Sequence, residues 1–165
     1  MLAHLVATRP MVLRLSTAAE LMTRNPLSFD KNTPIHKASA LLNFHNLEAA
    51  PVVDDCDRPE SVVSKTACAD WQEFCLRSSP RGRVSVDFDP TAVTEIANPI
   101  VETVHERDSS REVIERLIQQ KLRRIYVVND DGALIGVVSR ADVLRRLLAG
   151  DIRRRVRGAD ASMLC

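Results

Sequence analysis

One block of the sequence occurs twice, and this internal duplication restricts the fold more than any other feature. Leu47–Asp54 aligns without a gap on Leu122–Asn129, 75 positions later. Ser61–Ser64 aligns on Gly136–Ser139 at the same offset. Repeated units of this size bury only part of their apolar surface alone. We therefore expect two similar units that pack against each other.

The second copy shows the local structure of the repeat. Ile125–Val128 is a short apolar run rich in β-branched residues, Asp131-Gly132 is a hairpin turn signal, and Leu134–Val138 is a second apolar run. Ser139 follows directly and is suited to open a helix. With a strand and a helix before this block, each unit is predicted to be strand, helix, strand, strand, helix.

Caps and apolar spacing predict the helices. In the first copy, Thr33 is the expected N-cap and Pro34 the first helical residue. The stripe that follows consists of Ile35, Ala38, Leu41 and Leu42. In the second copy Asp108 or Ser109 caps the helix, with Glu112 completing a capping box. Its expected buried stripe is Val113, Ile114, Leu117 and Ile118.

A final helix is expected from about Ala141 to a stop at Gly150. The linker between the copies includes Val84–Val86, which could add a short edge strand. The predicted division of the chain is an N-terminal extension 1–15, repeat 1 at 16–75, a linker 76–92, repeat 2 at 93–150 and a basic tail 151–165.

Composition restricts the class of protein. Hydrophobic residues make up 45% and charged residues 27% of the 165 positions, which is typical of a globular domain. No apolar run approaches the roughly 20 residues that cross a bilayer, so we expect no membrane association. Residues 1–15 lack a basic start and a cleavage site, so we expect no signal peptide and a cytoplasmic protein.

Neither metal binding nor catalysis is predicted. The cysteines and histidines show no zinc-ligand spacing; they are Cys56, Cys68, Cys75, Cys165, His4, His36, His45 and His105. No nucleophile elbow and no glycine-rich phosphate loop occurs. We therefore expect a protein that is not an enzyme and uses no catalytic cofactor.

Arginines gather near the C-terminus, at positions 145, 146, 153, 154, 155 and 157. Such a run can bind nucleic acid or an acidic protein, although a solvated helix face is the favoured explanation. No aromatic residues lie between these arginines, which argues against binding of single strands. We do not expect a nucleic-acid partner.

The two copies together resemble a tandem pair of cystathionine β-synthase (CBS) domains, known as a Bateman module. The resemblance covers residues 16–150 and rests on the Val-Val-Asp-like strand ends and on Gly-Val-Val-Ser-x-x-Asp at 136–142. It implies a mixed α+β or α/β fold, in which two β-α-β-β-α repeats pack sheet to sheet with pseudo-twofold symmetry. It also implies two clefts for adenine nucleotides or adenosyl ligands, and pairing into a homodimer.

The residues of the second copy suit such a ligand. Ser139 at a helix start offers a hydroxyl beside free N–H groups for a phosphate, and Asp142 can accept both ribose hydroxyls. The resemblance places Arg124 at the position whose cation meets the phosphate, and Arg123 and Arg140 add charge nearby. The adenine is expected among Ile100, Val101, Ile125 and Val127. Ser-x-x-Asp is also an ordinary helix cap that binds nothing.

The first copy departs from this pattern. Ala67 stands where Asp142 stands, Ala49 replaces Arg124 and Glu48 replaces Arg123. Ser64 and Lys65 remain, so we expect a degenerate cleft here and one ligand per chain.

The predicted function is a stand-alone regulatory module. It senses AMP, ADP, ATP or S-adenosylmethionine in the repeat-2 cleft and signals to an unknown partner protein or through its own dimer. The alternatives are a ligand-free dimerising scaffold and nucleic-acid binding through the arginine-rich tail.

Overall fold

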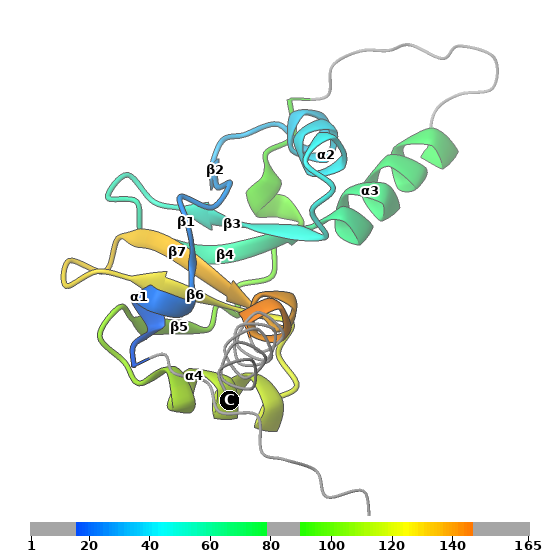
Figure 1. The fold of residues 1–165 in the computed structure, drawn as a ribbon. Helices are drawn as coiled ribbons and strands as arrows, with labels where there is room; N and C mark the ends of the chain where they lie inside the picture. Colours follow the sequence, from blue (N-terminus) through cyan, green and yellow to red (C-terminus); the bar gives the residue numbers. More distant parts are fainter. Residues whose placement is uncertain (1–15, 79–89, 147–165) are drawn as a thin grey trace, which may run out of the picture.

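The computed structural model describes residues 16–78 and 90–146, and these form two halves that face each other (Figure 1). The first half contains β2 (Phe29–Asp30), α2 (Ile35–Phe44), β3 (Ala49–Val53), β4 (Pro59–Ser64) and α3 (Lys65–Ser78). The second contains β5 (Thr103–His105), α4 (Ser110–Gln119), β6 (Arg124–Val128), β7 (Leu134–Ser139) and a helix whose described part is 140–146. The predicted order of elements is confirmed in both copies.

The two sheets have the same construction. In each half the first strand runs parallel to the second, and the second pairs with the third in an antiparallel hairpin. Ala49 pairs with Ser64 and Arg124 pairs with Ser139, at equivalent positions of the repeat. Both hairpins contain a register shift at the same place, between Val52 and Val53 and between Val127 and Val128. The duplication therefore extends to irregularities of the backbone.

Residues with a left-handed backbone conformation also occur at equivalent positions of the two copies. Gly132 in the predicted hairpin turn has φ 81°, and Asp57 at the equivalent position has φ 59°. Asn46 after α2 and Lys121 after α4 have φ 52° and 54°. These residues end the helices and close the turns in both halves.

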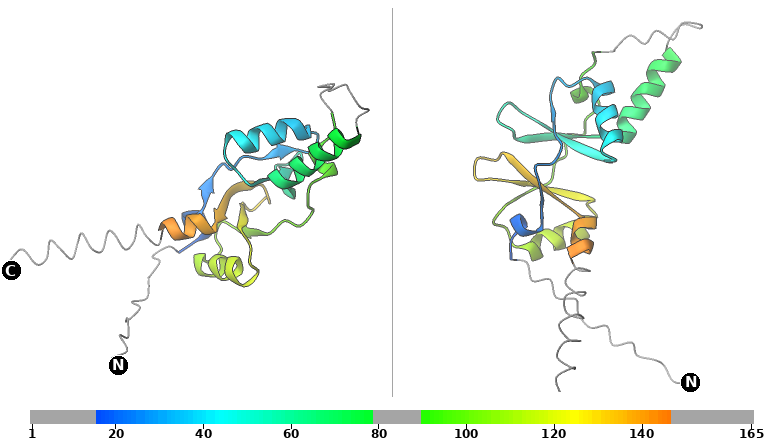
Figure 2. Two further views of the ribbon diagram at one scale, coloured as in Figure 1. Left: turned by 90° about the vertical axis from the view of Figure 1, so that its right-hand side faces the viewer. Right: turned by 45° about the horizontal axis from the view of Figure 1, so that its top comes forward.

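The sheets face each other and the helices cover their outer sides (Figure 2). Each half has its own apolar core, with Leu42 and Val63 fully buried in the first and Leu117 and Ile125 in the second. The tips of the two hairpins touch, because the Leu134 N–H donates to the Asp57 carbonyl at 2.9 Å. The predicted packing of sheet against sheet, and with it the fold class, is confirmed.

The ends of the repeats are exchanged between the halves. The first residues of repeat 1 form α1 (Ala18–Leu21) and β1 (Thr23–Arg24), and β1 pairs with β7 of the second half. In return, the 3-10 helix η1 (Val93–Glu95) packs in the first core, where Val93 donates its N–H to the Thr33 carbonyl at 2.8 Å. The predicted boundaries at 16 and 93 follow the sequence repeat and do not anticipate this exchange.

The exchange of segments explains why residue 136 of β7 is a glycine. Gly136 pairs with Arg24 where β1 lies beside β7, and a Cβ at Gly136 would overlap the side chain of Met22. The equivalent residue in the first half is Ser61, which pairs with Val52 within the hairpin. The difference between Gly136 and Ser61 therefore has a structural reason that is independent of any ligand.

Three local predictions need correction. Helix α2 begins at Ile35 rather than Pro34, because Pro34 is drawn into a bridge with Ala92. Ser109 is the N-cap of α4 but makes no side-chain cap bond, so the predicted capping box is not formed. Ile118 was expected in the buried stripe and is 66% exposed.

The edge strand at Val84–Val86, the stop at Gly150, the extension 1–15 and the basic tail 151–165 lie outside the described residues.

Candidate functional site

A cavity of about 510 Å³ lies between the two halves. From the first half it is lined by Glu48, Ala49, Val62, Ser64, Thr66 and Ala67. From repeat 2 come Ile96, Asn98, Ile100, Glu102, Leu122, Arg123, Arg124 and Tyr126. Small-molecule sites in proteins have volumes of roughly 300–1,000 Å³. The cavity is therefore large enough for a mononucleotide.

The start of α3 forms one wall. Strand β4 ends at Ser64 and α3 begins at the next residue, so the first turn of the helix lies beside the cavity. The Ser64 hydroxyl accepts a hydrogen bond from the Ala67 N–H at 3.1 Å, and the Lys65 N–H donates to the Glu48 carbonyl at 2.8 Å. The N-terminus of a helix carries partial positive charge, which favours an anion at this wall.

Two arginines of the second half form the opposite wall. Arg124 donates from Nη1 to the Ala49 carbonyl, so the equivalent residues of the two copies meet at this point. Arg123 is exposed beside it. Of the two acidic residues at the cavity, Glu102 is paired with Arg116 at 3.0 Å. The remaining charges of the lining are the carboxylate of Glu48 and the guanidinium groups of Arg123 and Arg124, so the cavity favours a negatively charged ligand.

Tyr126 completes the wall next to Arg124. The residue is 2% exposed, and its hydroxyl is buried without a hydrogen-bond partner among the residues described. Burial raises the pKa of the Tyr126 phenol, and the nearby Arg124 guanidinium opposes this in part. The phenol is therefore a neutral donor at physiological pH.

Ser139 and Asp142 lie together, but they do not line this cavity. Asp142 Oδ2 accepts hydrogen bonds from the Ser139 N–H at 3.0 Å and from the Ser139 hydroxyl at 2.6 Å. The Ser139 hydroxyl in turn accepts from the Asp142 N–H at 3.1 Å. Asp142 Oδ1 faces Thr23 at 3.4 Å and Arg145 at 3.0 Å. This is the capping arrangement that the sequence left open as the alternative to a ribose site.

The other predicted ligand residues are divided between locations. Ile125 and Val127 are fully buried in the core of the second half, and Val101 is half-buried away from the cavity wall. Arg140 donates to the carbonyls of Leu122 at 2.7 Å and Leu117 at 3.2 Å, so it closes the end of α4.

Residues that the sequence assigned to two different clefts meet in one. Arg123, Arg124 and Ile100 came from the predicted ligand cleft, whereas Ser64, Ala67 and Ala49 came from the predicted degenerate cleft. Lys65 does not line the cavity. These residues meet because the cavity is lined by the start of α3 from the first copy and by the start of β6 from the second.

Sequence reasoning missed Tyr126, Thr66 and Asn98 as cavity residues. Tyr126 had a usable signal, because side chains alternate along a strand. If Ile125 and Val127 point into the core, then Tyr126 and Arg124 must share the other face.

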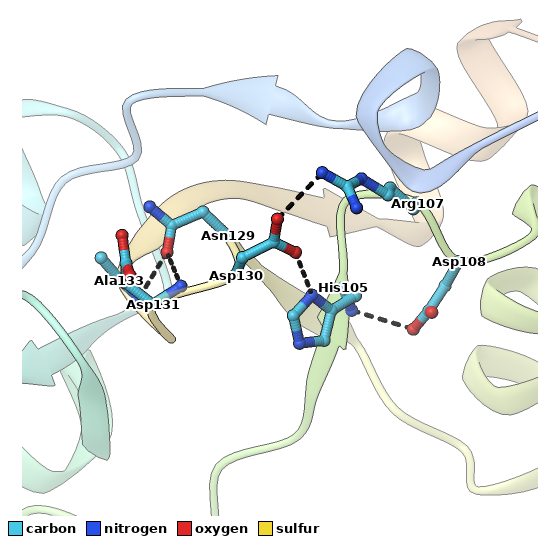
Figure 3. Close-up of polar contacts among 7 residues, drawn as sticks. All are labelled: His105, Arg107, Asp108, Asn129, Asp130, Asp131 and Ala133. Carbon is cyan, nitrogen blue, oxygen red and sulfur yellow. Dashed lines mark hydrogen bonds and ion pairs between the residues drawn. The ribbon is translucent and has the colours of Figure 1, made fainter.

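A second polar group lies at the hairpin between β6 and β7 (Figure 3). Asp130 contacts Arg107 at 2.9 Å and His105 Nδ1 at 3.7 Å, and Asn129 Oδ1 accepts two N–H bonds of the turn. His105, Arg107 and Asp130 are exposed, Asn129 is half-buried, and none of the four lines the cavity. Within 16–78 and 90–146, no three His, Cys, Asp or Glu residues are placed to hold a metal ion.

In the described part of the chain, every helix is too short or too polar to cross a membrane.

Comparison with known proteins gives one consistent result. Residues 18–72 and 93–149 each match the family described as CBS domain. Inosine-5'-monophosphate dehydrogenase of Halobacterium salinarum is 25% identical over 147 residues, which cover 88% of this chain but only 27% of that enzyme. The CBS domain-containing protein YhcV of Bacillus subtilis is 26% identical over 129 residues, 78% of this chain and 84% of YhcV. The crystal structure of CBSX2 in complex with AMP superposes with a TM-score of 0.66 at 25% identity, over 81% of this chain and 97% of CBSX2.

Proposed function

Because the chain belongs to the CBS domain family and carries two copies of the domain in tandem, we propose that it is a regulatory protein that senses an adenosyl ligand. The proposed ligand is AMP, ADP, ATP or S-adenosylmethionine, and the proposed site is the cavity between the two halves. The observation that carries the proposal is the composition of that cavity: two arginines from one half face a helix start from the other.

The positive charges of the cavity wall indicate where the phosphate of the proposed ligand would bind. Arg123 and Arg124 supply guanidinium donors, and the first turn of α3 at Thr66 supplies the positive end of a helix dipole. Ile96, Ile100 and Val62 offer apolar contact for an adenine. The CBSX2 complex supports this choice of ligand, since CBSX2 binds AMP and shares the fold at 25% identity.

The cavity differs from the cleft expected from the sequence in its ribose contacts. Ala67 provides no carboxylate for the two hydroxyls, and Asp142 is held by Ser139 at its own helix start. A ligand at Ser139 would have to compete with these capping bonds. This is why we place the ligand at the arginines.

The proposal assigns no catalytic step to this chain. A ligand regulates only if it binds one arrangement of the two halves, of a dimer or of a partner complex more tightly than another. The cavity lies where the halves meet, so a ligand there contacts both and can favour one relative arrangement. The receiver of the signal is proposed to be a second copy of the chain or another protein.

Isothermal titration with AMP, ADP, ATP and S-adenosylmethionine tests the proposal. We expect saturable binding near one site per chain, weakened by Arg123→Ala. The matched control is Arg107→Ala, because Arg107 is an exposed arginine that pairs with Asp130 and does not line the cavity. Loss of binding in Asp142→Ala but not in Arg123→Ala would move the site to the Ser139 helix start. No binding of any ligand would favour a ligand-free scaffold.

A further inference from the structure

We infer that the Tyr126 hydroxyl is a specificity-determining contact of the cavity, donating a hydrogen bond to the anionic group of the bound ligand. The inference rests on the proposed function and adds a residue and a chemical preference to it. The residue has no counterpart in the first copy, where Pro51 occupies the equivalent position.

The first support is the position of the side chain. Along β6, Ile125 and Val127 are fully buried in the core of the second half, so Tyr126 lies on the opposite face with Arg124. That face is directed at the first half, where Arg124 bonds the Ala49 carbonyl. Tyr126 and Arg124 therefore reach the cavity from neighbouring positions of one strand face.

The second support is an unmet hydrogen-bonding requirement. The Tyr126 hydroxyl is buried and makes no hydrogen bond of acceptable geometry with the described residues. Arg124 lies close enough to oppose the rise in the pKa of the phenol, but an arginine can only donate, so the O–H of Tyr126 has no acceptor. Other polar groups at the cavity have protein partners: Asn98 Oδ1 accepts from the Ile100 N–H at 2.9 Å, and Glu102 pairs with Arg116 at 3.0 Å. Buried hydroxyls in folded proteins are nearly always bonded, so an orphaned one at a cavity wall indicates a partner supplied from outside the chain.

The chemistry of the pair selects the partner. Burial keeps the phenol protonated, and an arginine side chain can only donate. A group that accepts from both donors is an oxyanion, either the phosphate of a nucleotide or the carboxylate of S-adenosylmethionine. An uncharged nucleoside lacks this group. Tyr126 should therefore contribute to the preference of the cavity for AMP over adenosine.

Titration of three proteins with AMP, adenosine and S-adenosylmethionine tests the inference. Tyr126→Phe is expected to bind AMP about tenfold more weakly and adenosine with nearly unchanged affinity, since one hydrogen bond to a charged group is lost. The control is Ser39→Ala, a change of a buried serine in α2 away from the cavity, which should leave both affinities unchanged. Equal loss for S-adenosylmethionine would identify a carboxylate as an acceptable anion.

A second readout needs no substitution. Tyr126 is the one tyrosine of the sequence, so a tyrosine-specific carbon label gives a single resonance at the phenol carbon. AMP should shift this resonance with the same midpoint as the titration heat, and adenosine should shift it less. If the wild type binds AMP but Tyr126→Phe binds it equally well and the resonance stays in place, the inference is overturned and the proposed function stands. If the wild type binds none of the ligands, both fail.

Discussion

Replacing Asp142 by alanine should destabilise the second half through loss of the helix cap, whether or not a ligand is present. Asp142 is 8% exposed, and its Oδ2 accepts one backbone and one hydroxyl hydrogen bond from Ser139 at 3.0 and 2.6 Å. A cap bond contributes about 1 kcal/mol, and a hydrogen bond to a charged group about 1.5–3 kcal/mol. The ion pair with Arg145 adds little, because Arg145 is 74% exposed.

The expected loss is roughly 2–3 kcal/mol of unfolding free energy. It is no larger because the Ser139 hydroxyl can turn to bond water when Asp142 is removed. For a chain of this length it corresponds to about 5–10 °C in Tm. Urea unfolding followed by far-ultraviolet circular dichroism measures it. The control is Asp70→Ala, an exposed carboxylate on the equivalent helix α3, expected to stay within about 0.5 kcal/mol of wild type. An Asp142→Ala protein as stable as the control would refute the reasoning.

Three further outcomes are expected. Ala67→Asp should stabilise α3 by about 0.5–1 kcal/mol in urea unfolding. The Ala67 N–H already donates to the Ser64 hydroxyl, and the new carboxylate would accept from Ser64 as Asp142 does from Ser139. An unchanged or lowered unfolding midpoint contradicts this. Gly136→Ala should cost about 1–3 kcal/mol of unfolding free energy, since its Cβ overlaps the Met22 side chain. A wild-type melting temperature would show that Met22 does not pack against Gly136. Burial raises the pKa of Tyr126, so near-ultraviolet titration should show the phenol ionising at higher pH in the folded than in the urea-unfolded chain. The associated stability is present below the unfolded pKa of about 10 and is lost as pH rises towards the folded value; coinciding titration curves would be evidence against it.

The architecture of each copy could be predicted because its signals are local. The apolar run at Ile125–Val128, the turn at Gly132 and the second run up to Val138 appear in the structure as β6, the hairpin and β7. The alignment between the copies carried the same elements to the first half. Helix stripes were also local, apart from Ile118.

The exchange of segments could not be predicted in this way. Thr23 pairs with Val137, more than a hundred residues away, and no short-range pattern in the sequence specifies that contact. The same exchange altered the helix starts, because Thr17 bridges to Ser109 and Ala92 bridges to Pro34. Tertiary contacts there replaced the expected side-chain caps.

The sequence indicates candidate residue types for a ligand site, and the structure shows which of them line one cavity. Arg123, Arg124 and Ser64 do line the cavity, whereas Ser139 and Asp142 satisfy each other at their own helix start. The sequence interpretation grouped candidate residues by their distance along the chain, and that distance does not specify which elements line one cavity. In the folded chain each copy contributes different elements to the same wall.

Photoaffinity labelling with an azido analogue of AMP, followed by mapping of the labelled peptide, tests the central claim most directly. We expect labels within residues 48–67 or 96–126, which contain the cavity lining, and competition by unlabelled AMP. Labels confined to residues 139–146, or labelling that excess AMP does not reduce, would contradict a nucleotide site between the two halves.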